Sequence, residues 1–285
     1  MGSWGLVLAL AGVLLLAVPP LAGYPAIWSI VIGSAGAALG AVSILVYGRR
    51  LLFAAASAPH AAFFAASLAF IVSNEIGGPQ LAWTIVIGVA IVYSLGYLAY
   101  RGVDPDDAAA VTVSFSTSAG VIAAMYALSK YSYGGGIVSV IMGDPLLARP
   151  SEALASLVLG VASVSLAFLT AREIAYIGLD RDDAALSGIR LWLYDLALYT
   201  LIGVTVMSLV RVVGFVIEHV LLLIPGALAV AAGGRSYETV ALSIGTTLVA
   251  SGLGLLIAIA LNLSPSGVIG LLIVVAYLLV LASKR

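Results

Sequence analysis

The 285-residue sequence contains no cysteine, and only 9% of its residues are charged. Without cysteine, the chain forms no disulfide, offers no thiolate to a metal and has no cysteine nucleophile. Soluble domains contain about 25% charged residues, so the shortage of charge argues against a soluble globular fold. With a net charge of −1 and no basic stripe, the chain is not expected to bind nucleic acid.

Long apolar runs fill most of the chain, of which 63% is hydrophobic. A helix of about 20 apolar residues crosses the ~30 Å hydrocarbon core of a bilayer. The runs are longer than barrel strands and do not alternate as those strands do. We therefore predict an all-α, polytopic transmembrane helical bundle that forms a single domain over residues 1–285. The ten predicted spans are 3–22, 26–47, 53–73, 80–100, 108–128, 152–171, 190–210, 213–232, 238–261 and 267–283.

The first span has two interpretations, and residues 1–25 are treated as an extra N-terminal segment. The segment lacks a basic stretch at its start, which disfavours a cleaved signal peptide, whereas its "PPLAG" is similar to a cleavage region. Cleavage would leave nine spans. The predicted topology from residue 26 onward would not change.

The distribution of lysine and arginine predicts the orientation. When the loop with Arg49 and Arg50 is placed in the cytoplasm, nine of the 12 basic residues lie on that side. The three on the outside are Lys130, Arg149 and Arg211. We therefore expect a multi-pass protein of the cytoplasmic membrane with both termini in the cytoplasm.

The longest predicted cytoplasmic connection, residues 172–190, is polar and has room for a short helix. Asp180 or Asp182 would cap the start of this helix, and Gly188 would end it. A short amphipathic helix between two spans suits the docking of a partner. From the residues alone, an ordinary solvated loop is the favoured interpretation, and a docking helix is the alternative.

The sequence has two histidines, and both are predicted near the middle of the bilayer. His60 follows Arg50 by ~15 Å of helix, and His219 follows Arg211 by ~12 Å. An ionisable group at that depth costs on the order of 2.5–3.5 kcal/mol and usually faces protein or a water-filled path. Imidazole and carboxylate bind Zn²⁺, Mn²⁺ and Fe²⁺, so His60, His219 and Glu218 are candidate ligands on a translocation path.

Glu218 and His219 are adjacent, and neighbouring residues of a helix point about 100° apart. Only one of them is then expected to face the path, while the other bonds a neighbouring helix. The alternative is a buried, hydrogen-bonded Glu218–His219 pair that joins helices.

Five segments, in order and spacing, resemble the membrane subunit of the ABC importers for zinc, manganese and iron. The resemblance extends over about residues 25–283, although each short motif is weak by itself. The segments are "YGRRLLFAAASAPHAAFFAASLAF", "GDPLL", "DRDDAALSGIR", "VVGFVIEHVLLLIPGALA" and "LNLSPSGVIGLLIVVAYLLVL".

This resemblance implies a homodimeric permease with the type II fold of the cobalamin importer. Two cytoplasmic ABC ATPase subunits would drive it, and an extracytoplasmic metal-binding lipoprotein would deliver the ion. The chain itself would be a transport subunit rather than an enzyme and would bind no cofactor, because the divalent metal is its substrate. The coupling helix that docks on the ATPase would comprise Asp182, Asp183, Ala184, Leu186, Ser187 and Gly188.

One position departs from the family's pattern. Where the family carries Gly-Asp-Ala-Leu-Ser-His, this chain has Ala55 to His60, with Ala56 at the place of the aspartate. The resemblance therefore leaves the metal open, and it leaves room for another cargo.

Two other functions compete with an ABC permease. A secondary transporter would use His60, Glu218 and His219 as a proton or ion relay, but the halves of the chain show no clear inverted repeat. An intramembrane metalloenzyme would need a denser ligand set such as His-Glu-x-x-His, which "EHVLLL" does not supply. The sequence also has no Gly-x-x-x-x-Gly-Lys-Ser/Thr motif, which agrees with ATP hydrolysis on a separate subunit.

Overall fold

The computed structural model describes residues 4–131, 143 and 145–284, and the regular structure in these residues is entirely helical. Ten of the described α-helices are long and apolar enough to cross a membrane, which confirms the predicted all-α multispan architecture. The short elements are η1 (Pro145–Leu147) and α8 (Arg181–Leu186). The spans are α1 (Trp4–Leu21), α2 (Ala26–Gly48), α3 (Leu52–Glu75), α4 (Gln80–Tyr100), α5 (Pro105–Lys130), α7 (Pro150–Leu179), α9 (Leu191–Val213), α10 (Phe215–Ala232), α11 (Ser236–Leu261) and α12 (Pro265–Ala282).

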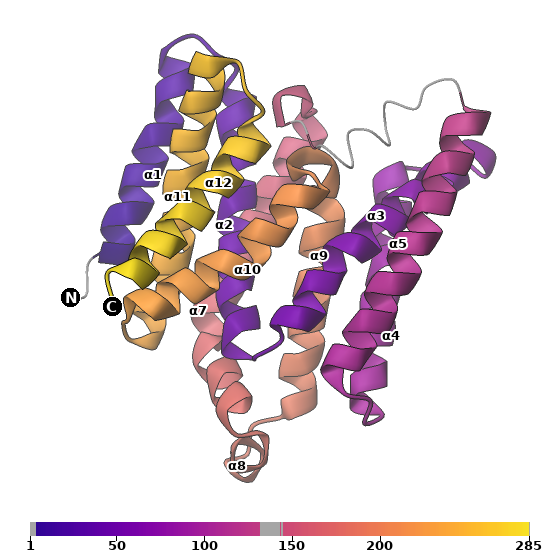
Figure 1. The fold of residues 1–285 in the computed structure, drawn as a ribbon, viewed down its shortest axis with the longest axis vertical. Coiled ribbons are helices and arrows are strands. Elements are labelled where there is room, and N and C mark those ends of the chain that lie inside the picture. Colours follow the sequence, from indigo (N-terminus) through magenta and orange to yellow (C-terminus); the bar gives the residue numbers. More distant parts are fainter. Residues whose placement is uncertain (1–3, 132–142, 144, 285) are drawn as a thin grey trace.

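The helices form a bundle around α2, which is buried along most of its length. α2 packs against α7, α10 and α11. The helices α3, α4 and α5 lie together at one side of the bundle, and α1, α11 and α12 lie at the other (Figure 1). The helix α10 contacts both α2 and α3, so it connects the centre of the bundle to the α3–α5 side.

The predicted connection over residues 172–190 is wrong at its start, because α7 continues to Leu179. Ala171, Ile174 and Ile177 are buried and recur every three residues, so the last turns of α7 still pack one face against the bundle. The connection itself is left with α8 and a few flanking residues.

Asp180, one of the two predicted caps of the short connecting helix, is confirmed, and two other helix starts can be compared with it. The Asp104 carboxylate accepts a hydrogen bond from the Asp106 amide at 2.9 Å, and Pro105 is the first residue of α5. The Asp180 carboxylate accepts from the Asp183 amide at 2.9 Å, so Asp180 caps α8. Ser264 occupies the cap position of α12 but makes no side-chain capping bond.

Glycines allow α1 to pack closely against α11. Gly5 and Gly12 lie seven residues apart on α1, and Gly245 and Gly252 repeat that spacing on α11. A Cβ atom at Gly12 would lie 2.5 Å from the Leu248 Cβ and 2.6 Å from its carbonyl carbon. Small residues of this kind bring membrane helices into van der Waals contact, because lipid offers no hydrophobic driving force between them.

We expect the variant Gly12→Val to separate α1 from α11 and to destabilise the bundle by about 1–3 kcal/mol, the usual cost of overpacking. The measurement is thermal unfolding of the detergent-solubilised protein, followed by size-exclusion chromatography. Gly267→Val is the matched control, because a Cβ atom there meets nothing within 4 Å. Equal melting temperatures for the two variants would contradict a close α1–α11 contact.

Candidate functional site

The structure brings the two histidines together from α3 and α10. The ring centroids of His60 and His219 are 5.0 Å apart, with the ring planes at 81°. Phe215, one turn before His219, has its ring centroid 5.1 Å from that of His60 and 4.7 Å from that of His219. Both histidines are partly exposed, as are Phe215 and Thr117, which contact them.

Each imidazole is held by a hydrogen bond at its Nδ1 atom. In His219, Nδ1 lies 2.8 Å from the Phe215 carbonyl oxygen, and in His60 it lies 2.8 Å from the Thr117 Oγ1. A carbonyl oxygen only accepts, so we assign the His219 proton to Nδ1, which leaves the lone pair on Nε2. Bonds of this kind select the tautomer and orient a ring that binds a metal.

Glu218 lies apart from this pair. Its side chain is fully buried, and neither carboxylate oxygen has a hydrogen-bond partner among the described residues. It lies in the first turn of α10, on the buried face that also carries Leu222 and Pro225. No hydrogen bond joins Glu218 to His219, and its assignment to the path stays a prediction.

Three of the sequence motifs meet at the start of the helix that carries His219. Gly214 has φ 91° and is the single residue between the end of α9 and the start of α10. A Cβ atom at Gly143 of "GDPLL" would lie 2.3 Å from the main chain of Val213, so only glycine fits there. Ser266 of "LSPSG" donates its hydroxyl to the Val213 carbonyl at 2.9 Å. Asp144 lies outside the described residues.

The short helix α8 is tied to the end of α7. The Tyr176 hydroxyl donates to the Asp183 carboxylate at 2.5 Å and lies 3.1 Å from the Ser187 hydroxyl. Ala184 is buried beneath the helix. Asp183, Ala184 and Ser187 are thus involved in holding α8 in place.

The outer face of α8 is formed by other residues of the predicted coupling helix. Leu186 is 87% exposed, which is unusual for a leucine, and Asp182 is exposed beside it. Gly188, with φ 84°, directs the chain from α8 toward α9.

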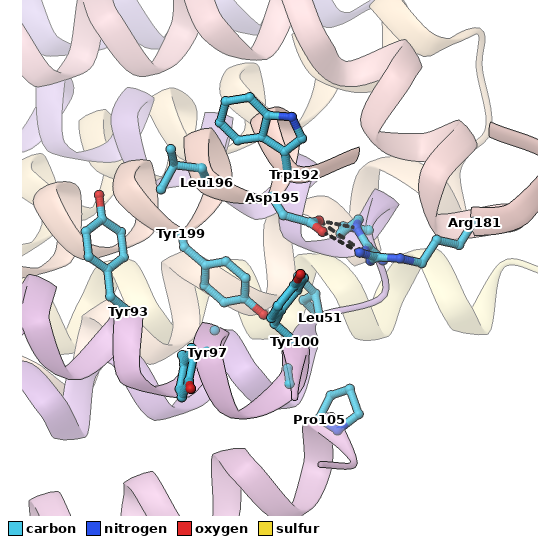
Figure 2. Close-up of a pocket in the computed structure, with 13 residues that line it drawn as sticks. Leu51, Tyr93, Tyr97, Tyr100, Pro105, Arg181, Trp192, Asp195, Leu196 and Tyr199 are labelled. Carbon is cyan, nitrogen blue, oxygen red and sulfur yellow. Dashed lines mark hydrogen bonds and ion pairs between the residues drawn. The ribbon is translucent and has the colours of Figure 1, made fainter. Parts of the chain in front are cut away.

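An ion cluster joins α8 to two transmembrane helices. One oxygen of Asp195, near the start of α9, lies 3.0 Å from Arg49 Nη2 and 3.1 Å from Arg49 Nε, and its other oxygen lies 3.0 Å from Arg181 Nη2 (Figure 2). The Arg49 and Asp195 side chains are only 14% and 20% exposed. The Asp195 carboxylate therefore has two arginine partners, one on each of its oxygens.

A cavity of about 720 Å³ lies beside the ion cluster, between α4 and α9. Figure 2 shows aromatic side chains around it, and these are Tyr93, Tyr97 and Tyr100 of α4 with Trp192 and Tyr199 of α9. Neither histidine is part of its lining. The histidine pair and the ion cluster are therefore two separate features of the bundle.

Comparison with known proteins gives the family of the chain. The sequence matches the ABC 3 transport family over residues 24–284, which covers every described helix except α1. A protein of Thermotoga maritima named "Probable metal transport system membrane protein" is 25% identical over 239 residues, which are 84% of this chain and 82% of that protein. An uncharacterized membrane protein of Synechocystis is 24% identical over 249 residues, 87% of this chain and 86% of its own length.

The fold also resembles a solved structure, PsaBC from Streptococcus pneumoniae in complex with Fab. The TM-score is 0.74 at 21% sequence identity, over 88% of each chain. At this level of identity the likeness concerns the fold, which agrees with the type II permease architecture that the sequence motifs implied. With the family match over all but the first span, these results show that the chain is a membrane permease of the ABC 3 transport family.

Proposed function

We propose that this permease moves a divalent transition metal ion into the cell as the membrane subunit of an ABC importer, with His60 and His219 on the translocation path. The observation that supports this most is the pairing of the only two histidines within the membrane domain, with ring centroids 5.0 Å apart. Two nitrogen ligands give a weak, incomplete coordination shell. A transport site needs this property, because the ion must leave again.

The proposal includes three partners. Cytoplasmic ABC ATPase subunits would contact the exposed face of α8, where Leu186 projects from a helix that Tyr176 ties to α7. An extracytoplasmic metal-binding protein would deliver the ion at the opposite side. A second copy of the chain would complete the permease, as the resemblance to the metal importers implies.

The ion cluster suggests how a movement of the ATPase during ATP hydrolysis would be transmitted to the transmembrane helices. Arg181 is the first residue of α8, Asp195 lies near the start of α9, and Arg49 follows the end of α2. A displacement of α8 by a bound ATPase would therefore act on two transmembrane helices through one carboxylate. The family match supports this ATP-driven function over a secondary transporter that works alone.

The test is metal uptake into proteoliposomes that contain the chain with its ABC ATPase and its metal-binding protein. We expect Zn²⁺, Mn²⁺ or Fe²⁺ to accumulate only when ATP is supplied and the ATPase is present. Liposomes with the permease alone are the control. ATP-independent uptake driven by a proton gradient would instead support the relay of His60, Glu218 and His219. Absence of uptake of all three metals by an ATP-hydrolysing complex would refute the metal assignment.

A further inference from the structure

The cavity between α4 and α9 is a groove lined by one row of large side chains from each helix. The two rows are Tyr93, Tyr97 and Tyr100 of α4, and Trp192, Leu196 and Tyr199 of α9. Both rows have the spacing i, i+4 and i+7, which places their members on one face of each helix. Seven residues at 1.5 Å per residue give the rows a length of about 10 Å. The hydrocarbon of one bilayer leaflet is about 15 Å deep, so the groove follows much of the depth of an acyl chain.

The two ends of the groove differ in chemistry. At the end inside the bundle, the Tyr93 hydroxyl lies 2.7 Å from the Thr200 Oγ1 and links α4 to α9. At the other end, where α4 ends and α9 begins, the lining includes Arg49, Arg181 and Asp195 (Figure 2). The groove therefore runs from aromatic side chains to a charged cluster, along two helices that can cross a membrane.

The groove is open along its side. Tyr97, Trp192 and Leu196 are exposed on the surface of the bundle although they also line the cavity. Tyrosine and tryptophan have an apolar body with a polar tip, and they concentrate where the hydrocarbon of a membrane meets the head groups. The order of apolar, aromatic and charged groups along the groove is thus the order of groups along a phospholipid.

We propose that this groove binds a phospholipid with an anionic head group, taken from the leaflet on the side of α8. The acyl chain would lie between the two rows of side chains. The phosphate would contact Arg181, whose side chain is nearly half exposed and whose planar guanidinium matches a phosphate. Two arginines against one aspartate leave an excess of one positive charge in the lining, which complements an anionic head group. The inference does not depend on which ion is transported.

The first test is native mass spectrometry of the purified permease in detergent, titrated with phosphatidylglycerol or with phosphatidylcholine of the same acyl chains. We expect phosphatidylglycerol to bind about fivefold more tightly, which is the usual effect of one basic residue on an anionic lipid. Arg181→Gln leaves one arginine against one aspartate and should abolish this preference. Arg190→Gln is the matched control, because Arg190 is exposed nearby but lies outside the described lining, and it should keep the preference.

A second pair of variants tests the position of the acyl chain without changing any charge. Leu196→Trp would fill the groove and should remove one tightly bound phosphatidylglycerol per chain, because the bulkier side chain occupies the volume that the lipid needs. Leu193→Trp is the control. Leu193 lies on the same helix and is 46% exposed, against 44% for Leu196, but it lies outside the described lining.

Several outcomes would overturn the proposal. One is equal affinity of the wild type for the two lipids, and another is equal lipid retention by the two tryptophan variants. Displacement of phosphatidylglycerol by an equal concentration of glycerol phosphate would identify a soluble phosphate as the ligand instead. A change from dimer to monomer in Leu196→Trp alone, without loss of lipid, would show that a second copy of the chain covers the groove. If one variant does not fold, the other pair and the wild-type preference still decide the question.

Discussion

Replacing His60 with alanine is expected to reduce ATP-driven metal uptake by about 100-fold or more. The change removes one of only two imidazoles that the structure brings together, and even partners that merely orient a metal ligand are worth about 10–100-fold. The measurement is initial uptake rate in proteoliposomes, with ATP hydrolysis followed in parallel. Basal hydrolysis should persist, because α8 packs against α7 and α9 and not against α3, which carries His60.

Two further variants test whether the loss of uptake is caused by disruption of the histidine pair. His219→Ala should match His60→Ala, since each removes one member of the same pair. Thr117→Val keeps the shape of the threonine but removes the hydroxyl that holds His60 Nδ1, so we expect an intermediate loss of about tenfold. Wild-type uptake rates in both histidine variants, with normal folding, would place the path elsewhere in the bundle.

The second large effect is expected at the ion cluster, where Asp195→Ala should uncouple ATP hydrolysis from transport. Without the carboxylate, Arg49 is left largely buried without its partner, and Arg181 no longer ties α8 to α9. Breaking such a pair costs several kcal/mol when it is fully buried, and about 1–3 kcal/mol is expected at the partial exposure seen here. The number of metal ions moved per ATP hydrolysed should therefore fall several-fold.

The matched control for Asp195→Ala is Glu75→Ala, which breaks the ion pair with Lys130 at a distance of 2.5 Å. Both of those side chains are nearly half exposed, and solvent screens such an exposed pair so that it contributes little to stability. Coupling should then be unchanged. If Asp195→Ala transported as many ions per ATP as Glu75→Ala does, the cluster would be a local stabilising feature with no role in coupling.

Much of the fold follows from composition and local chemistry. Runs of about 20 apolar residues specify membrane helices by length alone, since an unpaired backbone cannot remain in lipid. Asp104 and Pro105 predict the start of α5, because capping depends on a few consecutive residues. The extension of α7 to Leu179 was missed, because its last turns are polar on one side and its buried face is visible only against the bundle.

The sequence predicted only part of the candidate site. Because an ionisable group in lipid is costly, the sequence pointed to His60, His219 and Glu218 as candidates. It could not predict which of these side chains contact one another. That depends on how α3 and α10 pack and on the rotation of each helix about its axis. The structure pairs the two histidines and directs Glu218 into the bundle.

What the sequence by itself determined is the class of the protein, its ten membrane spans and its candidate polar residues, because these depend on residue type and on short-range spacing. Only the tertiary structure decided that His60 faces His219 and that Asp195 bridges Arg49 and Arg181. Those contacts join segments more than a hundred residues apart in most cases. The physical reason is that long-range contacts depend on the packing of whole helices, which no local pattern encodes.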